Sequence, residues 1–303
     1  MLGYSIKRIL LAMLTTFIVI VITFFTMHAV PGGPFSKEKA PSPAVQAVLE
    51  ARFGLDKPVE EQFVQYLQNM FKGDWGISLK NGREIRDTVA EGIGISARLG
   101  LSSALVALVV GSILGVTAAV FRNKLPDRFI IFFTTLLVSV PSFVLATILL
   151  YFFSQKLGWF PVWSATQPSY VLPVLSLAMY PMAYITRMTK SSMLDVLGED
   201  YIRTARAKGV RRSSVLFKHA LRNAILPIIT YLGPMLAYTI TGSMVVETVF
   251  TMGGLGRIFV NSITNRDYPI IMACTIILSI LMVIMTLLCD LIYKLVDPRI
   301  DFD

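Results

Sequence analysis

Six long apolar runs, separated by polar segments, dominate the pattern of this chain. The first occupies residues 9–30, follows Lys7 and Arg8, and is interrupted by threonines and by His28 near its end. About 20 apolar residues are enough to cross a bilayer, whereas a cleaved signal peptide has a shorter apolar core. We therefore interpret this run as an uncleaved membrane-spanning helix, with His28 in a structural role. The other runs cover residues 99–121, 129–153, 171–186, 223–246 and 268–289.

Small residues and prolines within these runs predict local geometry. Gly111 and Gly115 lie four residues apart, on one face of a helix, where small residues allow another helix to approach closely. Pro141 predicts a kink in the third span, and Pro173 and Pro181 predict a short, broken fourth span. The predicted fold class is an all-α polytopic membrane protein with six transmembrane helices.

The segment 31–95 differs from the rest because it is polar, and it predicts two helices outside the membrane. Ser42, followed by a proline, is typical of a helix start, and Gly54 of a helix end. A second helix is expected between Pro58 and Gly73. Its apolar residues recur at helical spacing and predict a small core: Phe63, Tyr66, Leu67, Met70 and Phe71.

The chain is thereby divided into three parts. Residues 1–30 form an N-terminal transmembrane helix, residues 31–95 an external insert, and residues 96–303 a core of five transmembrane helices. The core contains a polar loop at residues 190–224, which is expected in the cytoplasm.

Composition supports a membrane protein and charge gives its orientation. The 303 residues are 54% hydrophobic and 16% charged, against about 25% charged in soluble domains. The net charge of +9 would suit nucleic acid, but Lys and Arg gather in alternate polar segments, as the positive-inside rule expects. We infer no nucleic-acid partner and place both termini in the cytoplasm.

Cys274 and Cys289 would lie about 22 Å apart along one helix, too far for a disulfide.

Motifs of catalysis are missing from the sequence. It contains no P-loop for ATP, no zinc-protease motif and no nucleophile elbow, and its two histidines and two cysteines do not cluster. We therefore predict no catalytic residue, no metal site and no cofactor within this chain.

The apolar runs contain no Asp, Glu, Lys or Arg. Ion-driven secondary transporters carry such groups at depth, so that alternative is disfavoured, and a channel lacks a selectivity-filter repeat.

One polar stretch, residues 199–209, predicts a short helix in the cytoplasmic loop. Glu199 and Asp200 begin it and Arg206 and Lys208 end it, in agreement with the helix dipole. Gly209 is placed to end it in a left-handed conformation. Tyr201 and Ile202 provide apolar anchors, while Thr204 and Ala205 keep one side smooth. A basic loop is also what membrane orientation alone would produce, so function rests on further features.

Those features are sequence motifs. Ala205, Gly209 and Leu221 have the spacing of the EAA loop of ABC-importer permeases. The segments RMTKSSM at 187–193, YIRTARAKG at 201–209 and HALRNA at 219–224 resemble the dipeptide/oligopeptide permeases. The general motif has Glu, Ala and Pro where this chain has Arg203, Thr204 and Arg222. Four external segments resemble the B-type subunits: GLDKP at 54–58, GDWGIS at 73–78, VETVF at 246–250 and NRDY at 265–268.

The resemblance covers essentially the whole chain and implies a permease subunit of a peptide ABC importer in a bacterial cytoplasmic membrane. Its implied partners are a homologous second permease, two ATPase subunits that bind ATP and Mg, an external peptide-binding protein, peptide and lipid. Relatives that carry nickel complexes or glycosides are alternatives. The residues implied to couple transport to the ATPases are Glu199, Asp200, Tyr201, Ile202, Arg203, Thr204, Ala205, Arg206, Ala207, Lys208, Gly209 and Leu221.

Glu247 stands at the external end of the fifth run. A lone carboxylate there is usually a solvated helix end or half of a structural ion pair. The alternative is a role in the gate or in binding the amino group of a peptide.

Overall fold

The computed structural model describes residues 2–31, 33–35, 48, 50, 51, 53–240 and 244–296. Every element within this part is a helix, apart from an isolated β-bridge between Ile77 and Glu84, so the all-α class is confirmed. The chain forms two compact units, Met1–Gly94 with Gly253–Val283 and Ile95–Met252 with Ile284–Asp303. The helix expected from Ser42 lies outside the described residues, except for its end. Gly54 there has a φ of +67°, which suits a helix-ending glycine.

The first unit contains α1 (Leu2–Ala29), α3 (Val59–Phe71), the start of α4 (Ile85–Val120), α13 (Leu255–Asn265) and most of α14 (Tyr268–Val296). The predicted stripe on α3 forms a core: Phe63, Tyr66, Leu67 and Met70 pack around Ile20, Phe24, Met272 and Ile276. Burial raises the pKa of the Tyr66 phenol above its usual value, so this residue stays neutral. Phe71 was wrongly included in the stripe, since it is 83% exposed at the end of α3.

His28 has the structural role that the sequence predicted. Its Nδ1 lies 2.8 Å from the carbonyl oxygen of Phe24 and its Nε2 lies 3.2 Å from Oε1 of Gln62. Its ring also stacks on that of Phe24. The histidine therefore joins α1 to α3.

Two of the motif segments meet at a buried carboxylate. Asp267, 3% exposed, accepts a 2.5 Å hydrogen bond from the hydroxyl of Ser78 and a 3.1 Å bond from the N–H of Leu79. Ser78 closes the GDWGIS segment and Asp267 belongs to NRDY. These two separate segments thus share one contact, which joins the polar segment to the start of α14.

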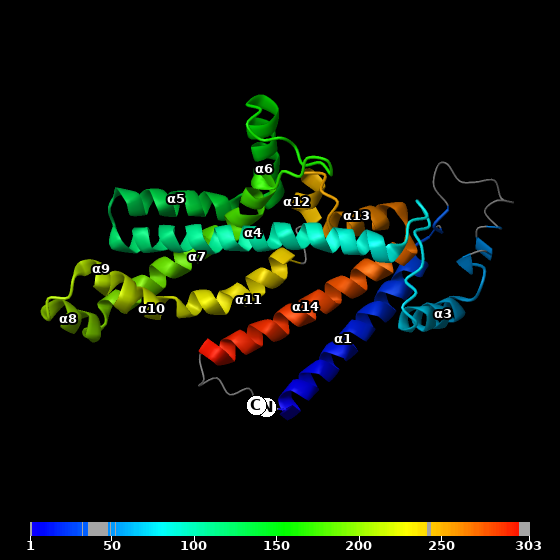
Figure 1. The fold of residues 1–303 in the computed structure, drawn as a ribbon, viewed down its shortest axis with the longest axis horizontal. Coiled ribbons are helices and arrows are strands. Elements are labelled where there is room, and N and C mark those ends of the chain that lie inside the picture. The colour runs from blue at the N-terminus through cyan, green and yellow to red at the C-terminus, as the bar shows by residue number, and fades with distance from the viewer. Residues whose placement is uncertain are drawn as a thin grey trace. The chain divides into compact units, whose positions relative to one another are not determined.

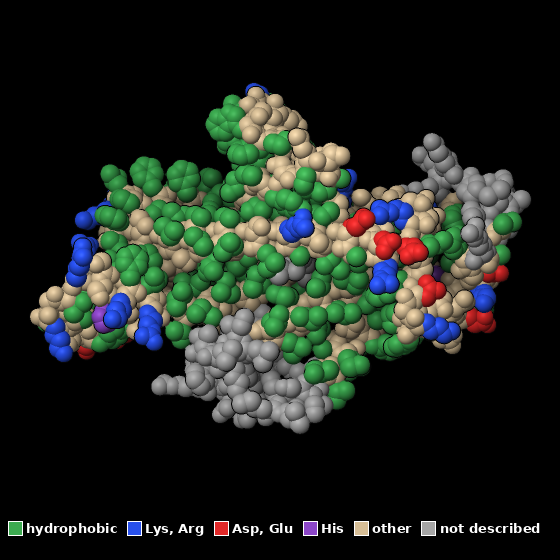
Figure 2. Space-filling view, in the orientation of Figure 1, with side chains coloured by type: hydrophobic (Ala, Val, Ile, Leu, Met, Phe, Trp, Pro, Cys, Tyr) green, Lys and Arg blue, Asp and Glu red, His purple; other side chains and the backbone are tan. Residues whose placement is uncertain are grey.

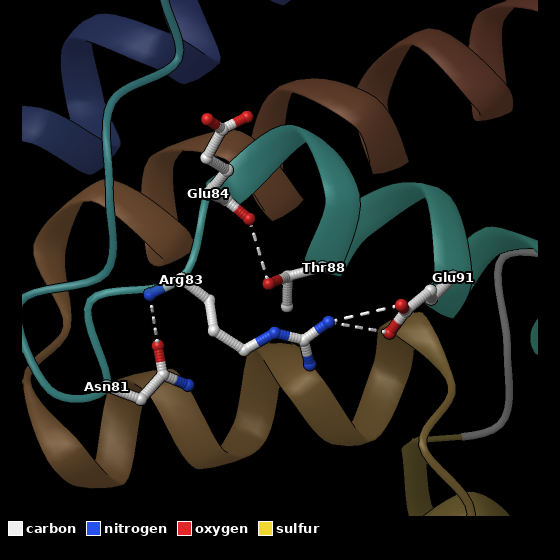
Figure 3. Close-up of polar contacts among 5 residues, drawn as sticks. All are labelled: Asn81, Arg83, Glu84, Thr88 and Glu91. Carbon is white, nitrogen blue, oxygen red and sulfur yellow. Dashed lines mark hydrogen bonds and ion pairs between the residues drawn. The ribbon is translucent and has the colours of Figure 1, made fainter.

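Helix α4 begins well before the apolar run that revealed it. Its first turns are amphipathic, with Ile85 and Val89 buried in the core of the first unit. Figure 3 shows the polar side of this start, where the Arg83 guanidinium donates to both carboxylate oxygens of Glu91 at 3.1 Å. The Thr88 hydroxyl bonds the carbonyl of Glu84 at 3.0 Å. Hydropathy locates the spanning part of this helix but not its start, because the first turns carry charges.

The second unit contains the rest of α4 and a series of shorter elements around one long helix. These elements are α5 (Leu125–Ser139), α6 (Ser142–Leu149), the π-helix η1 (Leu150–Lys156), α7 (Val171–Gly198), α8 (Asp200–Ala207), α9 (Arg212–Ser214), the π-helix η2 (Val215–Ala220), α10 (Leu221–Ala224), α11 (Leu226–Ile240) and α12 (Met244–Val249). Helix α7 contacts α5, α6, α8, α10, α11 and α12. It runs beside α5 and continues through a short turn into α8 (Figure 1).

The helices accommodate six spans. Four are long and apolar enough to cross a bilayer alone: Ile9–Ala29, Ile85–Val120, Val171–Gly198 and Tyr268–Leu288. The number reaches six if each of two bent pairs counts as one span, Leu125–Ser139 with Ser142–Lys156 at 106° and Arg212–Ala224 with Leu226–Thr239 at 51°. The division of the chain at residues 30 and 95 stays a prediction.

The prolines act differently from one another. Pro141 does more than kink the third span: the chain turns by 106° there, with Val140 extended before the ring. The predicted break of the fourth span is wrong, because α7 is helical throughout. Pro173 falls in its first turn, where the missing N–H has no helical partner to lose. Pro181 lies inside α7 and is buried, and packing on several neighbours keeps this stretch helical.

The close approach predicted at Gly111 and Gly115 is confirmed. A Cβ at Gly111 would lie 2.8 Å from the carbonyl oxygen of Met182, and one at Gly115 would lie 2.4 Å from Cβ of Thr189. Both contacts are with α7. The backbones of α4 and α7 therefore touch where no side chain intervenes.

We expect Gly115→Ala to destabilise the membrane core, because the added methyl forces α4 away from α7, at a cost of about 1–3 kcal/mol. The measurement is thermal unfolding of the purified importer in detergent. Gly94→Ala on the same helix is the matched control, since a Cβ there meets nothing within 4 Å. Equal melting temperatures for the two variants would contradict the close packing.

Candidate coupling site

Helix α8 has the ending that the sequence predicted and is one residue shorter at each end than expected. It covers Asp200–Ala207, with Glu199 in extended conformation before it. Gly209 has a φ of +74°. Its N–H bonds the carbonyl of Arg206 at 3.0 Å, and the N–H of Val210 bonds that of Ala205 at 3.1 Å. This pair of bonds is the Schellman motif, which satisfies the last carbonyls of a helix.

One face of α8 is fixed to its own chain. Ile202 is fully buried in a cluster with Ala119 of α4, Met193 of α7, Val215, Ala220 and Ala224. Ala205 and Leu221 pack on this cluster and are half-buried. Ile202 is thus the apolar anchor that was predicted. Tyr201 is held differently: it is 42% exposed, and its hydroxyl accepts a 2.6 Å hydrogen bond from Nδ2 of Asn223.

The other face of α8 is open. Arg203, Thr204 and Ala207 are exposed and neighbour one another on the helix. We call them the α8 ridge. The pairing of Arg203 with Asp200 at 3.3 Å is a surface contact that contributes little to stability. Since Ala205 turns toward the chain's own cluster, the ridge is the part of α8 that another protein can reach.

Basic side chains surround this face. Figure 2 shows Lys and Arg gathered over the end of the second unit that carries α8 and α9. Behind α8 lies a pocket of about 500 Å³, which joins the ends of α4 and α7 to the polar loop. Its lining residues are Ala119, Val120, Leu197, Arg206, Val210, Arg212, Val215 and Leu216. Sequence reasoning missed this pocket because its walls come from three separate segments.

The base of α7 is attached to α5 by polar contacts. The ammonium of Lys190 lies 2.5 Å from Oδ1 of Asp127, whose other oxygen accepts a 2.8 Å bond from the N–H of Asn123. One turn away, the Arg187 guanidinium donates to the hydroxyl of Thr135 at 2.8 Å. The predicted spans excluded these charged residues, but the helices continue through them. Displacement of α8 would therefore reach α5 as well as α7.

Glu247 is not a solvated helix end, which corrects one of the expectations for it. It lies on α12, is fully buried, and accepts a 2.6 Å hydrogen bond from the hydroxyl of Ser96 on α4. Its neighbours Val246 and Phe250 belong to an apolar cluster with Leu99 and Leu172. The apolar runs end one residue before Glu247, so hydropathy could not reveal this burial. Among the described residues, no three His, Cys, Asp or Glu side chains form a metal site.

Comparison with known protein families identifies the family of this chain. The profile of binding-protein-dependent transport system inner membrane components matches residues 111–302, and that of their N-terminal part matches residues 1–90. The chain belongs to this family. It is therefore a multi-pass inner-membrane component, in agreement with the resemblance noted from its loop motifs.

Relatives of this permease match over their full length. The dipeptide transport system permease protein DppB of Bacillus subtilis is 42% identical over 98% of this chain and 97% of its own. The oligopeptide transport system permease protein OppB of Haemophilus influenzae is 41% identical over the whole of both chains. The glutathione transport system permease protein GsiC of Escherichia coli is 38% identical over the whole of both.

Solved structures support the fold. The inward-facing MetNI methionine ABC transporter contains a chain that is similar with a TM-score of 0.57 and 19% identity, over 69% of this chain and 96% of that one. An amino acid ABC transporter gives a TM-score of 0.56 at 16% identity, over 69% of this chain and 94% of the other. The architecture is therefore that of the type I ABC importer permeases.

For the buried carboxylate we predict that Ser96→Ala destabilises the permease by about 1–3 kcal/mol, because Glu247 loses a hydrogen-bond donor inside an apolar cluster. Thermal unfolding of the detergent-purified importer measures this loss. Ser103→Ala is the control, because among the described residues that hydroxyl bonds only the carbonyl of Leu99 in its own helix. If both variants unfold at the wild-type temperature, the Ser96 contact contributes nothing to stability.

Proposed function

We propose that this permease forms half of the translocation path of an ATP-driven peptide importer and that α8 couples it to the ATPases. The observation that carries the proposal is the full-length relationship to the dipeptide, oligopeptide and glutathione permeases. The partners would be a second homologous permease, two ATPase subunits that bind ATP and Mg, and an external peptide-binding protein. This chain itself would hydrolyse nothing.

The geometry of α8 supports the coupling role. A single residue, Glu199, separates α8 from the end of α7, and Ile202 fixes its inner face to α4 and α7. A force applied to α8 therefore moves the ends of two spanning helices rather than a loose loop. The α8 ridge is exposed, and the small side chains of Thr204 and Ala207 project little from the helix. Such a surface suits insertion into a groove of another protein.

Charge supports an orientation with α8 and both termini in the cytoplasm. The basic residues around α8 and those of the hairpin between α4 and α5 belong to one unit. By the positive-inside rule these segments stay on the side where ATP is present. ATP-driven closure of the ATPases would then turn the spans from inward- to outward-facing, and peptide would enter from the external binding protein.

The test is uptake of labelled dipeptide and pentapeptide by the complete importer in liposomes that contain ATP and Mg. Ionophores that collapse all ion gradients should leave uptake unchanged, because the energy comes from the partner ATPases. Loss of uptake at constant ATP would favour an ion-driven transporter instead. Uptake of a nickel complex or a glycoside, with none of peptide, would select those alternatives.

The coupling role is tested on the α8 ridge. We expect Thr204→Trp to reduce transport at least tenfold and to release the ATPases on purification, because the bulky ring keeps their surface away. The amount of inserted permease should stay at the wild-type level, since the side chain points outward. Lys124→Trp, on the other exposed basic hairpin, is the matched control and should keep full transport. A Thr204→Trp importer that retains both ATPases and transports normally would place the coupling contact elsewhere.

A further inference from the structure

Four tyrosines from α7 and α11 gather on one exposed face of the second unit. Tyr180, Tyr184 and Tyr238 are 48%, 42% and 58% exposed. Tyr231 is half-buried among them, with its ring centroid 4.5 Å from that of Tyr184. Tyr180, Tyr184 and Tyr238 are all close enough to Tyr231 to interact with it electrostatically. We call this group the tyrosine face.

The tyrosine face lies at depth along its helices. At about 1.5 Å per residue, Tyr180 is roughly 14 Å from the start of α7, whereas Tyr184 lies near the end of the apolar run 171–186, before Arg187. Tyrosines that anchor a span at the membrane surface lie at its ends. Within the described part of the chain, the hydroxyls of Tyr180, Tyr184 and Tyr231 make no hydrogen bond. Such groups are unfavourable against lipid tails.

The exposed aromatic residues of α5, in the same unit, are of a different kind. On α5 the exposed aromatic residues are Phe129, Phe132 and Phe133, which carry no polar atom. The exposed stripe of α7 instead continues from Tyr184 to Arg187, which is also exposed. This stripe is therefore more polar than the exposed phenylalanines of α5, although its guanidinium donates to the hydroxyl of Thr135 on α5.

We propose that the tyrosine face binds the backbone of the transported peptide during its passage, an inference that rests on the proposed peptide import. A phenol hydroxyl both donates and accepts hydrogen bonds, so it matches the N–H and the C=O of any peptide unit. The rings offer apolar surface to side chains of varied shape. Four neutral residues favour neither acidic nor basic side chains, and the face therefore recognises peptides as a class.

A photo-crosslinker tests what the face contacts. Tyr184 is replaced by p-benzoylphenylalanine in the complete importer, which is irradiated while it takes up labelled dipeptide or pentapeptide. The expected adduct contains the peptide, forms only with ATP, and is absent when the crosslinker replaces Tyr151, which is exposed on η1. Adducts with lipid alone would overturn the proposal, and adducts with the second permease alone would make the face a subunit interface.

Removal of the hydroxyls tests their contribution. The double variant Tyr184→Phe with Tyr231→Phe keeps the ring contact, so the permease should assemble and unfold as the wild type does. The KM of uptake should rise at least about fivefold for both peptides, because two hydrogen bonds to the backbone are lost. Tyr151→Phe should leave KM unchanged. Wild-type KM values in the double variant would overturn the proposal, whereas absence of peptide uptake by the wild type would overturn the peptide function itself.

Discussion

The close contact of α4 with α7 at Gly111 and Gly115 is the constraint on which the second unit depends. Lipid tails are as apolar as leucine, so spanning helices gain little from burial and associate through close packing instead. At this contact the α7 side offers Ile185, Thr186 and Thr189, and the Thr186 hydroxyl bonds the carbonyl of Met182 on its own helix at 2.8 Å. The polar atom of Thr186 is thus satisfied within α7, and α4 can approach without competing for it.

Helix α7 then serves two purposes because it is continuous. Its membrane part is surrounded by α5, α6 and α11, while its last turns hold Met193 against Ile202 of α8. A break at Pro181 would have uncoupled these two ends. Pro181 is instead buried within a continuous α7, and Lys190 of the same helix pairs with Asp127 of α5. The coupling proposed for α8 would therefore depend on the packing of the membrane core.

Much of this arrangement could be predicted from the sequence because its physical causes are local. Apolar runs predicted the spans, charges and Gly209 predicted α8, and the spacing of Gly111 and Gly115 predicted a close helix pair. The errors concern causes that are not local. Whether Pro181 breaks a helix depends on its tertiary packing, and whether Glu247 is solvated depends on Ser96, far away in the sequence. The pocket behind α8 and the tyrosine face likewise combine residues from separate helices, so no single segment carries their signal.

The second unit also uses its polar groups in two distinct ways. Asp127 with Lys190 and Glu247 with Ser96 are paired within the chain, in buried or half-buried positions. Such pairs hold helices together, and their removal would leave a polar atom unsatisfied. The hydroxyls of Tyr180, Tyr184 and Tyr231, in contrast, lack a hydrogen-bond partner among the described residues. A hydroxyl without a hydrogen-bond partner in its own chain can bind a peptide during transport. Neutral phenols can also release that peptide, because each hydrogen bond is weak. The proposed path of neutral phenols would need no ion gradient, in agreement with the energy supply proposed to act through α8.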